Sequence, residues 1–304
     1  MFLKSFLIFV ILFLFLIQNF NNNKNINKNL LKIGLCVIGK NENLYIKEFI
    51  KHYKKIGYDH IFLYDNNDIN GESFENIIKN EIYKGFVSII NYRGYKGKNI
   101  NPQFKAYKDC YENNIFFNNN FSWLSFFDID EYLELIPNNL TIRNFLNLEI
   151  FNKCQVIKIN WVYYTNNNSL YYENKPLQQR LNIPLFKLDF NKHIKSTVRG
   201  KLPKNYWIKA NNPHSSVNNY ISCSSSGKII DSSSPYNFPA EYKFAYLKHY
   251  QMKSFEEYCL KIKRGRPIPN FKLYQNEKIS YLFNKYKNDI SRLNILKKIF
   301  NDTI

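Results

Sequence analysis

The sequence predicts an α/β fold in which helices flank a mostly parallel sheet. Short apolar runs alternate with stretches of helical periodicity from residue 32 onward, and polar residues follow the end of each run. The composition, 45% hydrophobic and 17% aromatic residues, excludes a disordered chain. The 304 residues suffice for one large domain. We therefore expect a single main domain followed by C-terminal helices.

The first half of this domain alternates strands with helices. Strands are expected at residues 33–38, 60–64, 86–91 and 123–127, and helices at residues 43–56, 73–80 and 102–112. Strands joined by helices run parallel, and parallel sheets bind ligands beyond the carboxyl ends of their strands. A functional site is therefore expected at those ends.

The second half is less regular. Residues 156–163 and 244–249 are predicted strands, and residues 165–235 are expected to form long loops and short hairpins. Ser254 and Glu257 form a capping-box pattern that opens a helix. Residues 277–300 are predicted to form one amphipathic helix.

An apolar run over residues 6–17 lies near the N-terminus. It is shorter than the roughly 20 helical residues that span a bilayer, which is typical of a signal peptide or a short signal anchor. We expect this segment at residues 1–20, an Asn- and Lys-rich stem at 21–31, the main domain at 32–250 and packed helices at 251–304. The expected location is a membrane, through one N-terminal anchor, with the domain in a secretory or Golgi-like lumen, or secretion if the segment is cleaved.

The formal net charge is +19, from 43 Lys and Arg against 24 Asp and Glu. Such an excess is common in proteins that bind nucleic acid or phosphate-bearing partners. The chain is also rich in Asn, Ile, Phe and Tyr, the pattern that an A/T-rich coding sequence produces without selection for a partner. We therefore expect no nucleic-acid partner.

The five cysteines are widely spaced and form no Cys/His group at zinc spacing, which argues against structural zinc. Cys36 and Cys154 lie in apolar runs, where a buried thiol is the expected state. An odd number leaves at least one cysteine without a partner in the chain. The sequence alone therefore defines no disulfide framework.

The strongest candidate for chemistry is the pair Asp128 and Asp130, which follows the predicted strand at 123–127. Carboxylates one residue apart at a strand end project into the same cleft and can hold Mn²⁺ or Mg²⁺ as hard oxygen ligands. His249 ends the last predicted strand and is a candidate third ligand. An acidic turn and a structural histidine are the alternatives.

Other polar residues lie where they can bind a phosphate-bearing ligand. Asn41 and Glu42 follow the first predicted strand, and Asp65 and Asn66 follow the second. Lys195, Arg199 and Arg264 can neutralise a diphosphate, with a solvated basic face as the alternative. The chain has no GxxxxGK[ST] or GxGxxG motif, which argues against P-loop transfer and dinucleotide binding.

Several ordered segments resemble the family 2-like and family 92-like group of glycosyltransferases with the GT-A fold. They are VIGKNENLYIKEFIKHYKKIGYDHIFLYDNND at 37–68, QFKAYKDCY at 103–111, WLSFFDIDEYL at 123–133, KINWVYY at 158–164, KSTVRGK at 195–201 and LKHYQMKSFEEYCLKIKRG at 247–265. The resemblance covers roughly residues 33–266. It implies a GT-A (Rossmann-like) fold and transfer of a hexose from a nucleotide-diphosphate sugar, with a UDP-sugar expected, to a glycan or glycoconjugate hydroxyl.

The resemblance also implies roles for the candidate residues. Asp128, Asp130 and His249 would hold the divalent metal. The donor would be bound by Asn41, Glu42, Asp65, Asn66, Gln103, Lys195, Arg199 and Arg264. Inversion at the anomeric carbon is expected from the family. The catalytic base is open, with Glu131 and His214 as the candidates. In the group's pattern an acidic residue often precedes the arginine matched by Arg180, whereas this chain has Gln179 there.

Two other functions remain as alternatives. A noncatalytic carbohydrate-binding protein of the same fold would keep the donor site and lack the base. A metal-dependent phosphodiesterase would also have an acidic strand end and a basic surface, but it normally needs more metal ligands than Asp128, Asp130 and His249.

Overall fold

The computed structural model describes residues 31–96, 101–113, 121–200, 202, 214, 220–265 and 271–300. Residues 32–304 form one compact unit, to which this description applies. The predicted anchor at 1–20 and nearly all of the predicted stem lie outside the described residues. Within the described part of the chain, no helix is both long enough and apolar enough to cross a bilayer.

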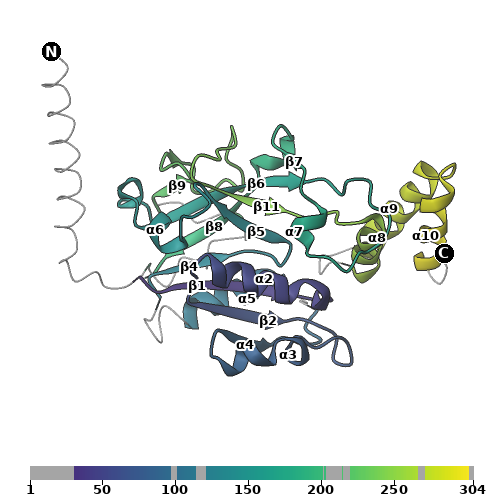
Figure 1. Cartoon of the computed structure of the whole chain (residues 1–304), viewed down its shortest axis with the longest axis horizontal. Helices are drawn as coiled ribbons and strands as arrows, with labels where there is room; N and C mark the ends of the chain where they lie inside the picture. Colours follow the sequence, from purple (N-terminus) through teal and green to yellow (C-terminus); the bar gives the residue numbers. More distant parts are fainter. Residues whose placement is uncertain are drawn as a thin grey trace, which may run out of the picture. The chain divides into compact units, whose positions relative to one another are not determined.

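The N-terminal half builds a parallel sheet around the buried strand β1 (Ile33–Gly39). On one side β1 pairs with β2 (His60–Asp65), which pairs with β3 (Val87–Asn91), and on the other side β1 pairs with β4 (Trp123–Phe126). All three pairings are parallel. The predicted strands of this half and the α/β class are confirmed (Figure 1).

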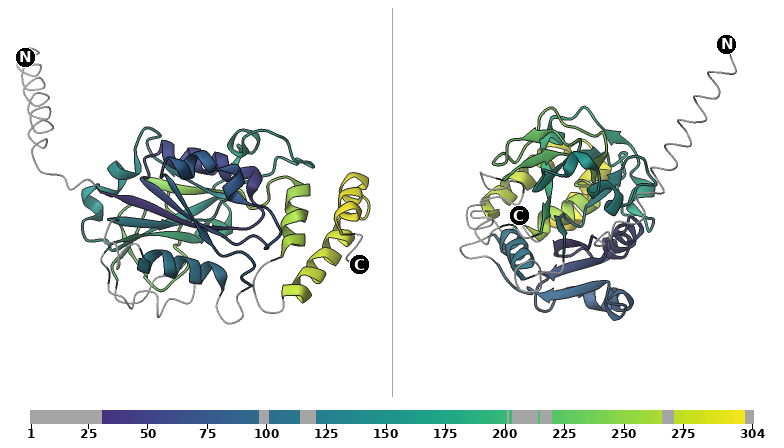
Figure 2. Two further views of the ribbon diagram at one scale, coloured as in Figure 1. Left: turned by 90° about the horizontal axis from the view of Figure 1, so that it is seen from below. Right: turned by 90° about the vertical axis from the view of Figure 1, so that its left-hand side faces the viewer.

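Helices cover both faces of this parallel sheet (Figure 2). Helix α2 (Asn43–Lys55) buries Tyr45, Ile46, Phe49, Ile50 and Tyr53, the apolar stripe expected from 3.6-residue periodicity. Helix α5 (Pro102–Tyr111) packs on the other face against a cluster with members from β1, β2 and β4. The helix predicted at 73–80 is two short helices, α3 (Phe74–Ile77) and α4 (Lys79–Tyr83).

The long strand β6 (Val156–Tyr164) joins two parts of the sheet. Its first five residues pair with β8 (Ile194–Arg199), which continues to β4, and β9 (Ser222–Ser224) lies on its other side. From Trp161 onward β6 pairs instead with β11 (Ala245–His249), and its last two residues pair with β7 (Pro184–Leu185). The sheet is therefore mixed in its second half, because β8 runs antiparallel to both β4 and β6.

The sequence pattern did not reveal several short elements. These are β5 (Glu131–Leu135), which pairs with β11, β10 (Ile229–Ile230), α6 (Ile142–Leu146), α7 (Leu177–Arg180) and the 3₁₀ turns η3 (Glu149–Phe151) and η4 (Asp189–Lys192). All six span five residues or fewer, too short for a periodic signal. Three of them, β10, α7 and η4, fall within residues 165–235, where the sequence predicts long loops and short hairpins.

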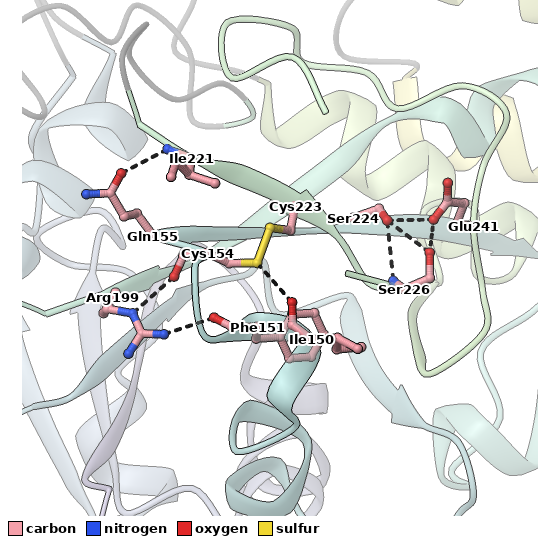
Figure 3. Close-up of a disulfide and its surroundings, with 10 residues drawn as sticks. All are labelled: Ile150, Phe151, Cys154, Gln155, Arg199, Ile221, Cys223, Ser224, Ser226 and Glu241. Carbon is pink, nitrogen blue, oxygen red and sulfur yellow. Dashed lines mark hydrogen bonds between the residues drawn. A yellow bond between two sulfur atoms is a disulfide. The ribbon is translucent and has the colours of Figure 1, made fainter. Parts of the chain in front are cut away.

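Two disulfides tie distant segments together. Cys36 of β1 bonds Cys110 of α5, and Cys154, just before β6, bonds Cys223 of β9 (Figure 3). Cys259 is free and buried. The expectation of buried thiols at Cys36 and Cys154 is therefore wrong. Their partners lie 74 and 69 residues away, and only the packing of sheet and helix brings them together.

Three helices end the chain: α8 (Phe255–Arg264), α9 (Phe271–Lys285) and α10 (Ile290–Phe300). The capping box at Ser254 and Glu257 is confirmed. The single helix predicted at 277–300 is two helices, since the Asp289 side chain accepts a hydrogen bond from the backbone of Arg292 and so caps α10. These helices share a small core whose buried members are Phe255, Cys259, Ile279, Leu282, Ile295, Leu296, Ile299 and Phe300.

Removal of the second disulfide is expected to destabilise the protein. Because it closes a loop of 69 residues, the double variant Cys154→Ser/Cys223→Ser should lower the free energy of unfolding by about 2–4 kcal/mol. Urea unfolding without reductant measures this, with Cys259→Ala as the control that removes only the free thiol. Equal stability of the double variant and the control would contradict the expectation.

His52 is expected to make stability depend on pH. It lies on α2 and donates from Nε2 to the carbonyl of Leu133 at 2.9 Å. Burial lowers the pKa of His52 to about 4, below its ordinary 6.5. Between pH 4 and pH 6.5, His52 binds a proton more readily in the unfolded chain than in the folded one. The contribution of neutral His52 to stability is therefore fully present above pH 6.5 and is lost as the pH falls toward 4.

We expect His52→Gln to reduce this acid sensitivity by up to ~1.4 kcal/mol per pH unit within that window, while stability at pH 8 changes much less. Thermal unfolding of both proteins from pH 8 to pH 4 measures the difference. Parallel curves would show that His52 does not contribute.

Candidate active site

A cavity of about 360 Å³ opens at the carboxyl ends of β1, β2 and β4, where the sequence placed the site. Its wall also includes Trp161 of β6 and His249 of β11. These two residues lie where β6 leaves its pairing with β8 and joins β11. The cavity therefore forms where the two parts of the sheet separate.

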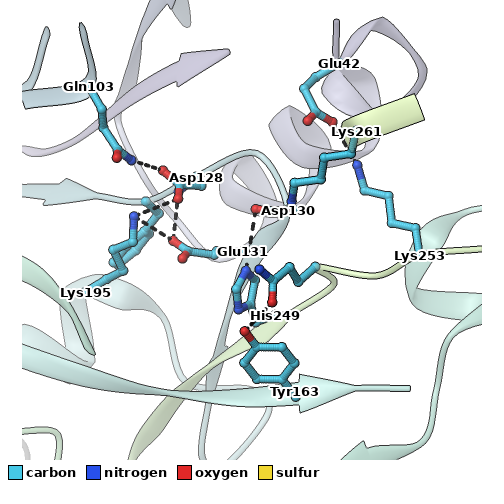
Figure 4. A network of polar contacts seen from close by, with 12 residues as sticks. Glu42, Gln103, Asp128, Asp130, Glu131, Tyr163, Lys195, His249, Lys253 and Lys261 are labelled. Carbon is cyan, nitrogen blue, oxygen red and sulfur yellow. Dashed lines mark hydrogen bonds and ion pairs between the residues drawn. The ribbon is translucent and has the colours of Figure 1, made fainter. Parts of the chain in front are cut away.

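The tight turn between β4 and β5 presents Asp128 and Asp130 to this cavity (Figure 4). Glu131 closes the turn, because its Oε2 accepts the backbone N–H of Asp128 at 2.8 Å and its own N–H donates to the carbonyl of Asp128 at 3.0 Å. Glu131 is fully buried and does not line the cavity. Its position is that of a residue that orients Asp128.

Lys195 lies beneath Asp128, fully buried. Its Nζ is 2.8 Å from Asp128 Oδ2 and 3.6 Å from Glu131 Oε2. The antiparallel register, in which Ser125 faces Thr197, places it there. Asp128 Oδ1 accepts hydrogen bonds from Gln103 and Tyr107.

These contacts set the charge states beneath the cavity. Burial raises the pKa of Asp128, but the charge and hydrogen bond of Lys195, together with the charge of His214, bring that pKa below its usual value. Burial raises the pKa of Glu131 well above its usual value despite the same lysine. Asp128 is therefore the ionised partner of Lys195, whereas the environment of Glu131 favours the neutral acid.

Asp130 and His249 are brought together by the pairing of β11 with β5. The N–H of Tyr250 donates to the carbonyl of Asp130 at 2.9 Å, and His249 Nε2 lies 3.9 Å from Asp130 Oδ1. Asp130 Oδ2 accepts from Lys261 of α8 at 2.6 Å. Although burial opposes it, Lys261 and His249 lower the pKa of Asp130. Burial lowers the pKa of His249 to about 4, so its imidazole is neutral at pH 7.

Glu42 anchors a second group of cations at the cavity rim. It accepts from Lys253 Nζ at 2.8 Å and from Arg264 Nη1 at 2.7 Å. The Lys253 ammonium also lies 3.3 Å from the ring centroid of Tyr45. Because α8 begins right after Lys253 and ends at Arg264, both ends of this helix contact one carboxylate from the N-terminal half.

The structure brings together half of the predicted donor-binding residues and all three predicted metal ligands. Those that line the cavity are Glu42, Asn66, Gln103 and Arg264 of the first group and Asp128, Asp130 and His249 of the second. Asp65 lies behind it, where it accepts from Arg93 Nη1 at 3.0 Å and from the Asn67 side chain at 2.7 Å. Asn41 also does not line the cavity, and its N–H donates to Asn67 Oδ1. Asp65 and Asn41 thus shape the loop that carries Asn66.

Arg199 lies away from the cavity. It faces Trp123 at the start of β4, at the opposite end from Asp128, and its guanidinium lies 4.4 Å from the Trp123 ring. It donates to the carbonyls of Phe151 and Cys154 (Figure 3). The strand that brings Lys195 beneath Asp128 necessarily takes Arg199, four residues on, away from it.

Of the two candidates for the base, His214 lines the cavity. Its Nδ1 is 2.8 Å from the carbonyl of Ile194, which can only accept, so Nδ1 carries the proton and Nε2 is the basic nitrogen. Burial lowers the pKa of His214 to about 3. Gln179 is exposed on α7, whereas Arg180 pairs with Glu257 at 2.6 Å and packs α7 against α8.

Sequence reasoning missed three contributors to the site: Lys253, Trp161 and Tyr107. Lys253 directly precedes the capping box of α8, and this position in the sequence could have identified it as a contributor to the site. Trp161 lies in the largely apolar strand β6 and Tyr107 on the buried face of helix α5, where an aromatic side chain is expected to belong to the core. Trp161 reaches the cavity because β6 leaves its pairing with β8 just before this residue and pairs with β11 from it onward.

Comparison with solved structures finds distant neighbours of this chain. The chain is similar in structure to TarS of S. aureus, with a TM-score of 0.38, 13% identity and coverage of 87% of this chain and 45% of that one. It is also similar to TarS 1–349, alone and in complex with UDP, each with a TM-score of 0.38, at 13% and 12% identity. These matches cover 90% of this chain and 74% and 75% of those chains.

The chain thus spans less than half the length of the first of these chains. No curated protein sequence matches the chain. The model of glycosyltransferase family 92 matches residues 32–292. The chain therefore belongs to glycosyltransferase family 92 and is a glycosyltransferase.

Proposed function

We propose that this glycosyltransferase moves a hexose from a nucleotide-diphosphate sugar, with UDP-sugars as the first donors to test, to a hydroxyl of a glycan or glycoconjugate. The observation that carries the proposal is the cavity at the strand ends, where the Asp128–Asp130 turn faces cations from the second half of the chain. Family membership supplies the reaction class.

The charges around the cavity suit a diphosphate. Among the described residues, four cations, Lys195, Lys253, Lys261 and Arg264, pair with the three carboxylates of Asp128, Asp130 and Glu42. Glu131 adds little negative charge while its raised pKa favours the neutral acid. The balance is thus slightly positive before a ligand binds, and Arg264 at the rim offers a guanidinium to phosphate oxygens.

We further propose that Mn²⁺ or Mg²⁺ binds with the donor. The described residues contain no group of three or more His, Cys, Asp or Glu side chains arranged to hold a metal alone. The Asp130 carboxylate and the neutral His249 imidazole nevertheless lie side by side, and the buried His249 Nδ1 has no hydrogen-bond partner among these residues. Asp130 and His249 can supply two ligands to the ion, beside Asp128, and oxygen atoms of the sugar donor would complete its coordination. The ion would stabilise negative charge on the leaving diphosphate.

The expected reaction is a single displacement with inversion. The acceptor oxygen forms a bond to the anomeric carbon as the bond to the diphosphate breaks, and the diphosphate keeps the electron pair. We propose that His214 Nε2 takes the acceptor proton. The low pKa of His214 keeps it neutral and able to accept, and the negative charge of a bound donor raises that pKa toward the working range. Lys195 and Glu131 keep Asp128 in place throughout.

The disulfides support a location outside the reducing cytosol. Both join segments about 70 residues apart within the catalytic unit, and such bonds persist in oxidising compartments. We therefore propose that the enzyme works in a secretory lumen or extracellularly. Attachment to a membrane through residues 1–20 remains a prediction.

A panel of nucleotide sugars tests the donor. Thermal unfolding with each donor, with and without Mn²⁺, should reveal one class that raises the midpoint, because a ligand that binds only the folded state stabilises it. Release of nucleoside diphosphate from that donor then measures turnover. Binding without sugar transfer or hydrolysis for any donor would instead favour a noncatalytic binder.

Asp130→Asn is expected to lower Mn²⁺-dependent turnover at least a hundredfold while the protein stays folded. It removes a charged ligand, and Lys261, which is 20% exposed, can turn toward solvent. Glu173→Gln is the matched control, since Glu173 pairs with Lys175 at the surface, is 52% exposed and, like its partner, does not line the cavity. Unchanged turnover in the Asp130 variant would overturn the metal assignment.

Lys195→Met is expected to lower the free energy of unfolding by about 3–5 kcal/mol, because it leaves the ionised Asp128 carboxylate without its buried cation. Lys175→Met is the control. Lys175 pairs with a glutamate, Glu173, at 3.0 Å, but these side chains are 66% and 52% exposed, so its loss should cost about 1 kcal/mol or less. Denaturant unfolding compares the two, and equal losses would contradict the role of Lys195.

A further inference from the structure

A row of aromatic rings leads from the cavity wall to the protein surface. Trp161 lines the cavity and stacks on His193, with ring centroids 4.9 Å apart and planes at 16°. Phe190 continues the row, with its ring 6.0 Å from His193 and at 13° to it. Tyr236 meets His193 edge-on at 4.8 Å. We call Trp161, His193, Phe190 and Tyr236 the aromatic row.

The outer end of the aromatic row is open to solvent. Phe190 is 57% exposed and Tyr236 is 43% exposed, whereas Trp161 at the inner end is 7% exposed. Single exposed apolar side chains are common and need no explanation. Here the two exposed rings share one neighbour, His193, and through it connect to the cavity. Continuity with a binding cavity is what distinguishes this surface from scattered exposure.

The inner end of the row carries one unused hydrogen-bond donor. The buried Trp161 Nε1 has no hydrogen-bond partner among the described residues, and its ring lies 4.2 Å from the ring of His249, the proposed metal ligand. Buried polar atoms are normally satisfied, so such atoms in a cavity wall point to a ligand that supplies the partner. A ligand with hydroxyl groups can accept from Trp161, whose indole nitrogen can only donate.

We propose that the aromatic row is the acceptor site and binds an oligosaccharide. The inference rests on the proposed glycosyl transfer and gives its acceptor a place in the fold. A pyranose ring has a face of C–H groups that packs on the electron-rich face of an aromatic ring, while its hydroxyls point outward to polar partners. Phe190 and Tyr236 then bind the outer sugars, and the sugar nearest Trp161 places its hydroxyl in the cavity, which His214 also lines.

An apolar partner, either a lipid surface or another protein, is the competing occupant. The segment around β7 carries exposed Leu185 and Phe186, and Leu188 follows, outside the aromatic row. If general apolar contact were the purpose of this surface, Phe186 would contribute as Phe190 does. Phe186 is 46% exposed and its ring contacts Tyr242 and Tyr246 but, among the described residues, no ring of the row, so it is a matched control.

The test measures binding of the unlabelled tetrasaccharides of glucose, N-acetylglucosamine, mannose and galactose to the full chain by saturation-transfer NMR, at millimolar concentration and without donor. This readout needs no catalysis, so it stays informative even if no donor is ever turned over. Where a donor is turned over, the KM for the bound tetrasaccharide is measured as well.

We expect Phe190→Ala and Tyr236→Ala each to weaken tetrasaccharide binding about three- to tenfold, the loss of one aromatic contact, and to raise the acceptor KM more than the donor KM. Phe186→Ala should behave as wild type. Absence of binding by every tetrasaccharide, wild-type affinity in both row variants, or an equal loss in Phe186→Ala would each overturn the proposal. The last result would indicate the lipid or protein partner.

Discussion

The arrangement of this molecule depends on keeping a cluster of carboxylates ionised in a poorly hydrated turn. Asp128 and Asp130 lie two positions apart in the sequence between β4 and β5, and the buried Glu131 follows them. Burying such charges without partners costs several kcal/mol per ion. The compensating cations come from distant parts of the chain: Lys195 from β8 and Lys261 from α8. The second half of the chain must therefore fold against the first for the turn to be stable.

The same requirement explains why the sheet is mixed. A parallel β8 would run in the opposite direction and carry Lys195 to the far end of β4, where Arg199 now lies against Trp123. The antiparallel strand places the lysine under the turn, and β6 then changes partner at Trp161 to reach β11. This change opens the cavity and brings His249 next to Asp130. The mixed topology of the sheet is thus a consequence of the need to pair the buried charges of the turn.

The sequence was sufficient for those parts of the fold that depend on local periodicity. The parallel strands, α2, α5 and the capping box of α8 follow from patterns within ten to fifteen residues, and the polar strand ends correctly located the cavity. The disulfides, the buried pairing of Lys195 and the displacement of Arg199 depend on register between distant strands, which no local pattern encodes. Glu131 was a reasonable candidate for a base because it follows Asp130, but the side chain turns inward to close its own turn.

The C-terminal helices are energetically linked to the cavity. Helix α8 is fixed at its start by the capping box and by Glu257, which holds Arg180 and Tyr45 together, and its later turns deliver Lys261 and Arg264 to the site. In the ligand-free state these cations are held by Asp130 and Glu42. In the proposed donor complex, the diphosphate would offer them a second set of anionic oxygens, so donor binding and the docking of α8 would stabilise each other through shared charges. Because α10 packs on α8 in the core that contains Phe255 and Cys259, this coupling would reach the end of the described chain.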